Sequence, residues 1–171
     1  MSMFEGSHPL LMATYNRWMN EKLYAACAGL SDEERKRDRG AFWKSIHSTL
    51  NHLLWGDHAW MGRFNGKSYP APAVGEDLHD GFDDLRAARV AMDAEILAWA
   101  GSLTPAWLAE PMTWTSRLYG FTQTHPRWVQ VTHMFNHQTH HRGQVHTLLT
   151  QLGIDIGATD VTLLPILNRR D

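Results

Sequence analysis

Histidine is the residue type of this chain best placed to do chemistry. Five of the 11 histidines fall in the segment HMFNHQTHHRGQVH, from His133 to His146, where an even spread would place about one. Two pairs in it, His133/His137 and His137/His141, are four residues apart, so on a helix each pair shares one face. Two imidazoles one turn apart can bind the same metal ion. The segment therefore predicts one wall of a metal site.

The phase of a helix through this segment separates its five histidines. His141 falls inside the apolar arc of the helix, and His137 falls at the edge of that arc. His133 and His140 are turned further toward the polar side, and His146 is opposite. Phase thus selects His137 and His141 as the inward pair.

The same helix offers a metal ion no carboxylate. Between Pro126 and Gly153 there is no Asp or Glu. Gln144 and His133 are instead candidates for hydrogen bonds around the ligands, because metal-bound imidazoles are oriented by such partners.

A third ligand is expected from an earlier helix, where His52 lies beside a wide apolar arc. Its neighbours on the helix surface are all small, namely Ser45, Thr49, Gly56 and Ala59. Such surroundings are typical of a pocket wall, but small residues would equally allow close helix packing. Three neutral imidazoles suit Zn(II), Ni(II) or Fe(II) and leave a coordination position open. The structural alternative is that these histidines hydrogen-bond to the backbone or to each other.

Composition limits the class of protein. A length of 171 residues predicts a single domain covering residues 1–171. The net charge of −2 and the absence of a long basic run argue against nucleic-acid binding. We expect a soluble cytoplasmic protein without a membrane segment, because Cys27 has no disulfide partner and no long apolar run or signal sequence occurs. Eight tryptophans indicate either a bulky core or an aromatic-lined pocket.

The hydrophobic pattern predicts an all-α fold, a four-helix bundle. Its helices are expected at about His8–Gly29, Ala41–Phe64, Gly81–Leu103, and from Pro126 to just before Gly153. A capping box at Ser31 and Glu34 predicts a short helical turn, and a small hairpin or extended excursion is expected between Pro111 and Thr122, before the last helix. The apolar arc of the second helix begins with Phe42, and Asp93 is assigned to the polar face of the third.

Three segments carry a resemblance to a known family. YNRWMNEKLYAA, NHLLWGDHAWMGRF and HMFNHQTHHRGQVHTLLTQLG resemble the DinB/YfiT-like family of bacterial four-helix-bundle metalloproteins, over about Tyr15 to Gly153. The resemblance implies that His52, His137 and His141 bind a divalent metal, and that homodimers are frequent. The family's Asp-Arg-x-Trp appears here with His58 in place of the arginine.

The resemblance also suggests an activity. Some relatives are transferases that conjugate a low-molecular-weight thiol to an electrophile, or isomerases that use such a thiol as a cofactor. The first hypothesis is therefore a metal-dependent thiol transferase acting on a small molecule, with the thiol supplied in solution because Cys27 has no metal-ligand partner nearby in sequence. The enzyme alternative is a hydrolase that uses metal-bound hydroxide, assisted by Gln144 or a nearby histidine. A non-catalytic metal-binding stress or sensor protein would need a fourth protein ligand such as His133. Weaker still is a pure interaction module in which the histidine-rich helix forms a dimer face.

Overall fold

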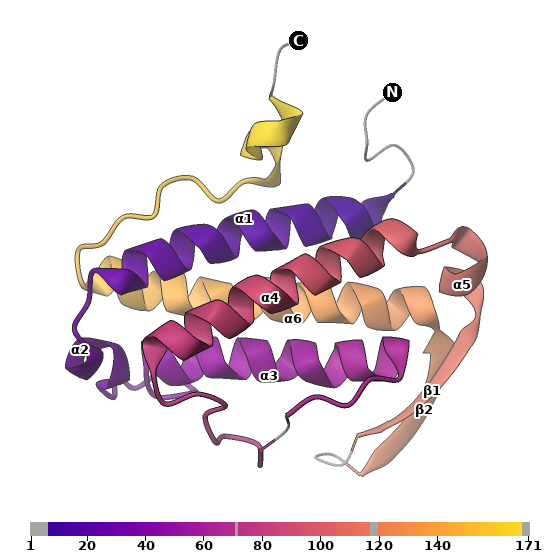
Figure 1. Ribbon diagram of the computed structural model, residues 1–171, viewed down its shortest axis with the longest axis horizontal. Coiled ribbons are helices and arrows are strands. Elements are labelled where there is room, and N and C mark those ends of the chain that lie inside the picture. The colour runs from indigo at the N-terminus through magenta and orange to yellow at the C-terminus, as the bar shows by residue number, and fades with distance from the viewer. Residues whose placement is uncertain (1–6, 71, 117–119, 169–171) are drawn as a thin grey trace.

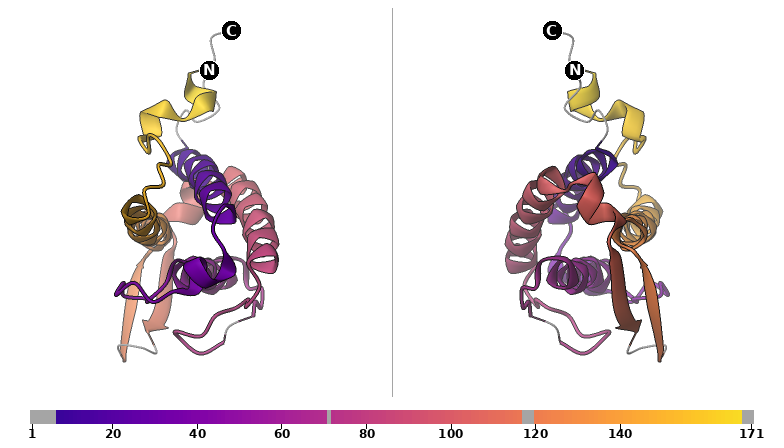
Figure 2. Two further views of the ribbon diagram at one scale, coloured as in Figure 1. Left: turned by 90° about the vertical axis from the view of Figure 1, so that its left-hand side faces the viewer. Right: turned by 90° about the vertical axis from the view of Figure 1, so that its right-hand side faces the viewer.

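Four long helices make the body of the molecule, in a computed structural model that describes residues 7–70, 72–116 and 120–168. They are α1 (His8–Ala28), α3 (Ile46–Asn65), α4 (Phe82–Ser102) and α6 (Arg127–Gln151), and they lie side by side (Figure 1). Helices α1 and α3 each pack against both α4 and α6, as the end-on views show (Figure 2). The all-α four-helix bundle is confirmed.

Neighbouring helices do not all run in opposite directions. Asp57 pairs with Arg89 and Phe64 stacks on Trp99, so α3 and α4 run the same way. The connection between them consequently returns along the length of the bundle before α4 begins (Figure 1). Helices α3 and α6 run in opposite directions, so residues later in α3 contact residues earlier in α6.

Shorter elements complete the fold. They are α2 (Asp32–Lys36), α5 (Pro105–Ala109), the antiparallel strands β1 (Pro111–Ser116) and β2 (Phe121–Pro126), and the 3₁₀ turns η1 (Val161–Leu163) and η2 (Pro165–Leu167). The Ser31 hydroxyl accepts a hydrogen bond from the Glu34 N–H at 3.1 Å, and the hairpin precedes α6, as both patterns predict. Within the described part of the chain, none of the helices combines the length and hydropathy needed to cross a membrane.

The start of α3 differs from the prediction, because the helix begins at Ile46 rather than near Ala41. Lys44 has a φ of 65°, which no right-handed helix accommodates. The hydroxyl of Ser45 then accepts a hydrogen bond from the N–H of Ser48 at 3.0 Å and caps the helix. Phe42, predicted to belong to the apolar arc, is 78% exposed on the turn before the cap.

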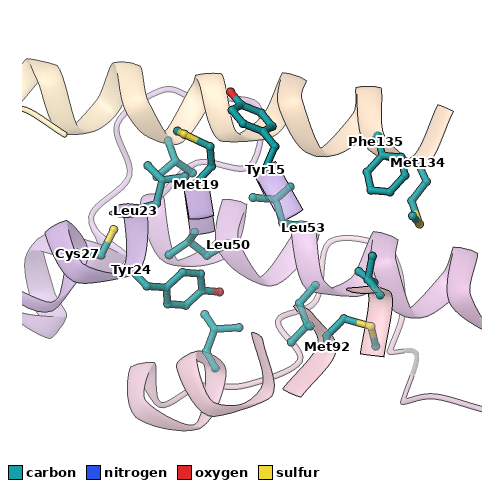
Figure 3. Packing of buried hydrophobic residues seen from close by; sticks show 14 of the residues in the cluster. Tyr15, Met19, Leu23, Tyr24, Cys27, Leu50, Leu53, Met92, Met134 and Phe135 are labelled. Carbon is teal, nitrogen blue, oxygen red and sulfur yellow. The ribbon is translucent and has the colours of Figure 1, made fainter. Parts of the chain in front are cut away.

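An apolar core lies between the helices. Each long helix contributes a fully buried aliphatic side chain, namely Leu23, Leu50, Ile96 and Leu149, and Figure 3 shows Leu23 and Leu50 within this core. Cys27 is also buried there, and burial raises the pKa of its thiol to about 12. The thiol therefore stays protonated and unreactive at neutral pH.

One polar network crosses the core and joins all four long helices. Arg89 on α4 pairs with Asp57 on α3 at 2.5 Å and with Asp93 on its own helix at 2.9 Å. Asn20 on α1 donates to Asp93 at 2.9 Å, and Gln138 on α6 donates to Asp57 at 2.5 Å. The assignment of Asp93 to the polar face was wrong: it is 4% exposed, because Arg89 and Asn20 satisfy its carboxylate inside the bundle.

Removing the cation from this network should strongly destabilise the fold. Arg89→Leu leaves two carboxylates buried without their charge partner, and we expect it to lower the free energy of unfolding by about 3–5 kcal/mol. The measurement is urea denaturation followed by far-UV circular dichroism. Arg86→Leu, which removes an exposed arginine from the same helix, should change stability by less than about 0.5 kcal/mol. Equal losses in the two variants would show that the buried pairing is not what stabilises the bundle.

Candidate metal centre

Two helices bring the three predicted histidines together. His52 comes from α3, and His137 and His141 come from successive turns of α6. One ring nitrogen from each of the three lies within 4.8 Å of the other two. The Nε2 atoms of His52 and His137 are 3.1 Å apart. This cluster could hold a metal ion, and the assignment of the three rings as its ligands stays a prediction.

One pair of ring nitrogens has the spacing that a tetrahedral ion requires. Zinc–nitrogen bonds of about 2.0–2.1 Å at tetrahedral angles separate two ligand nitrogens by about 3.3 Å. The 3.1 Å between His52 and His137 is close to that separation. Little movement of these two rings would be needed to admit a metal ion.

Gln144 fixes the tautomer of His141. The Nδ1–H of His141 donates to the Oε1 of Gln144 at 2.8 Å, which leaves the lone pair on Nε2. The amide nitrogen of Gln144 lies 3.3 Å from Nε2 of His140, so the amide is held from both ends. This contact suits the supporting role predicted for Gln144, which stays a prediction.

Burial keeps the three rings neutral. It lowers the pKa of His52 and of His137 to about 3, with a smaller contribution from the neighbouring His141. Burial also lowers the pKa of His141 below its usual value. At neutral pH each ring carries a lone pair that can bind a cation.

Two indole rings frame His52. The ring of Trp43 lies 3.9 Å from that of His52 at an interplanar angle of 22°, and the ring of Trp55 lies 5.9 Å away at 19°. These surroundings agree with the interpretation that tryptophans of this chain line a pocket. The position of Trp43 was missed because the sequence pattern extended α3 back through residues 41–45, and only the turn before Ser45 brings this indole against His52.

Gly56 allows the close approach of His137. A Cβ atom at position 56 would lie 2.7 Å from Cε1 of the His137 ring, closer than unbonded atoms approach. Gly56 therefore accounts both for the close packing of α3 against α6 and for the space that the His137 ring occupies. The small residues around His52 leave room that a histidine of the opposite helix fills.

The remaining histidines stay outside the cluster. His133 is exposed, with its ring 6.2 Å from that of His137 and packed edge-on against Trp60. It is not among the three residues whose nitrogens converge. The Nδ1–H of His58, where the related family has arginine, donates to the backbone carbonyl of Pro70 at 3.2 Å. His58 therefore holds the loop after α3 rather than the centre.

Comparison with known proteins agrees with this fold. The model of the DinB family matches residues 1–169. The chain is 23% identical to Protein DinB of Bacillus subtilis (strain 168) over 155 residues, which cover 87% of this chain and 88% of that protein. The fold is also similar to the crystal structure of a DinB-like protein from Bacillus cereus ATCC 10987, with a TM-score of 0.60 and 15% identity over 82% of this chain and 90% of that one.

The lowered histidine pKa values predict how stability depends on pH. In the unfolded chain these rings titrate near 6.5, whereas His52 and His137 titrate near 3 in the folded protein. As the pH falls below 6.5, the unfolded state takes up protons that the folded state does not, and the metal-free protein loses stability toward pH 3. The urea midpoint should fall between pH 7.5 and pH 5.0, and this fall should be smaller for His137→Leu than for wild type. An equal fall in both would contradict the buried, neutral state of His137.

Filling the space at Gly56 should weaken metal binding. In Gly56→Ala the new methyl group displaces the His137 ring, and we expect zinc affinity to fall at least 10-fold in a competition titration with a chromogenic chelator. Gly143→Ala is the matched control, because it adds the same methyl group to α6 where nothing lies within 4 Å. It should keep wild-type affinity and gain up to about 1 kcal/mol of stability. Unchanged affinity in Gly56→Ala would mean that the position of His137 does not govern binding.

Proposed function

Because the chain belongs to the DinB family, we propose that it binds one divalent metal ion through His52, His137 and His141 and uses it in catalysis. Zinc, nickel and iron(II) all accept imidazole ligands. Three protein ligands are the number found in catalytic zinc sites, which keep a further position for water or substrate. The convergence of three neutral rings, without a fourth protein group in the described cluster, is the observation that carries this proposal.

The charge of the centre favours an anionic substrate group. The three imidazoles bring no negative charge to a divalent ion. Among the described residues, no carboxylate belongs to the cluster of converging ligand atoms: Glu76 and Asp77 line a cavity beside His52, and the carboxylate of Asp57 is occupied by Arg89 and Gln138. A partly buried divalent charge is therefore best balanced by an anion from solution.

A thiolate meets this requirement, and we propose that the protein transfers a low-molecular-weight thiol to a small electrophile. A bound divalent metal lowers the pKa of a coordinated thiol, so that the thiolate forms at neutral pH. Cys27 cannot supply the sulfur, because it is buried in the core and its pKa is raised to about 12. The flat indoles of Trp43 and Trp55 beside His52 offer apolar surface to an electrophile.

Metal content and thiol transfer test this proposal together. Untagged wild-type protein should carry about one divalent ion per chain by elemental analysis. The metal-loaded protein should transfer bacillithiol, mycothiol or glutathione to a haloarene, as followed by absorbance. His137→Ala should lose both the metal and the transfer. His146→Ala, which removes a histidine of the same helix outside the cluster, should keep both.

The outcomes separate the alternatives. Turnover of a hydrolysable substrate without added thiol would indicate a hydrolase with metal-bound hydroxide instead. Stoichiometric metal without any turnover would indicate a metal-binding stress protein. Absence of metal from wild type, or its retention by His137→Ala, would overturn the three-histidine centre.

Assembly and location complete the proposal. We propose a homodimer, which the family resemblance supports and which light scattering can measure. A cytoplasmic location stays a prediction that rests on the single cysteine, Cys27.

A further inference from the structure

Among the described residues, Nδ1 of His52 has no hydrogen-bond partner of the kind that a metal-bound histidine needs. A metal-bound histidine normally donates its other ring N–H to an acceptor, which fixes its tautomer and orientation. His141 has Gln144 for this purpose. Within the described part of the chain, His52 is hydrogen-bonded through Nε2, to His137, and not through Nδ1. The neighbouring indoles fix the plane of the ring, but they do not decide which nitrogen carries the proton.

A small cavity lies beside His52 on the outer side of α3. Its volume is about 10 Å³, close to the smallest space that holds one water molecule. Its wall is formed by aromatic, polar and acidic residues, namely Trp43, Ser48, His52, Trp55, Gly75, Glu76 and Asp77. A water molecule in this cavity would lie beside the His52 ring and beside two carboxylates.

Asp77 is the better placed of the two carboxylates. The hydroxyl of Ser48 donates to Oδ2 of Asp77 at 3.2 Å. Ser48 precedes His52 by one helical turn, so the two share a face of α3. This contact holds the Asp77 carboxylate over the face that carries His52. Glu76 instead accepts a hydrogen bond from the N–H of Ala73 at 3.3 Å, within its own loop.

We propose that Asp77 is a positioning residue for His52 and acts through one water molecule in this cavity. The Nδ1–H of His52 donates to the water, and the water donates to the carboxylate of Asp77. This arrangement keeps the lone pair on Nε2, the nitrogen that faces His137. The loop before α4 thereby sets the tautomer and orientation of His52 on α3, as Gln144 does for His141. The inference rests on the proposed metal centre.

The experiment compares zinc affinity among loop variants in a chelator competition. Asp77→Ala removes the acceptor and should bind zinc 10- to 100-fold more weakly than wild type, the usual cost of losing such a partner. Asp77→Asn keeps an uncharged acceptor and should lose less. Asp80→Ala is the matched control, since it removes the same charge from the same loop, outside the cavity wall, and should keep wild-type affinity.

Two further readouts separate positioning from folding. The metal-free forms of all variants should unfold at the wild-type urea concentration. In the zinc-loaded protein, the Nδ1–H proton of His52 should give an NMR signal in wild type that Asp77→Ala loses through exchange with solvent.

The proposal is wrong if Asp77→Ala binds zinc as wild type does, or if Asp80→Ala loses as much affinity. Either result can occur while wild type still binds one zinc ion, so it would leave the metal centre standing. Failure of wild type to bind zinc would instead overturn the centre, and this inference with it.

Discussion

The buried position of Arg89 between two carboxylates is the constraint on which the rest of the structure depends. An apolar interface tolerates small slides of one helix along another, but a buried ion pair is satisfied in one register only. Asp57 and Gln138 hold α3 and α6 in that register. Each is the sequence neighbour of a residue at the metal centre, Gly56 and His137 respectively. The network inside the bundle therefore also sets the spacing of the histidines beside it.

The two polar sites of the bundle, the Arg89 network and the histidine cluster, differ in charge. The inner network is rich in formal charge, yet its acids and bases compensate one another, with Arg142 as a second buried cation. The histidine cluster has no formal charge and no internal compensation. Its rings stay neutral because burial opposes their protonation. A site of this kind gains most from a cation that arrives together with an anion, which is the basis of the proposed thiolate chemistry.

Much of this architecture follows from the sequence. Helical phase alone selected His137 and His141, and the structure brings His52 to them across the bundle. Two features did not follow. Lys44 has a positive φ without being glycine, so the apolar pattern continued the predicted helix through the turn that places Trp43. The burial of Asp93 and Arg89 could not be predicted, because charged residues normally face solvent. Only the pairing of distant segments makes their burial favourable.

The distance along the chain between the two walls of the centre has a consequence for folding. His52 and His137 are 85 residues apart, and Asn20 and Asp93 are 73 apart. Closing such loops costs chain entropy before any contact compensates for it. The unfolded chain offers a metal only the local pair on α6, whereas the folded chain offers all three rings. By linkage, a metal ion would select the completed topology over every partly assembled one.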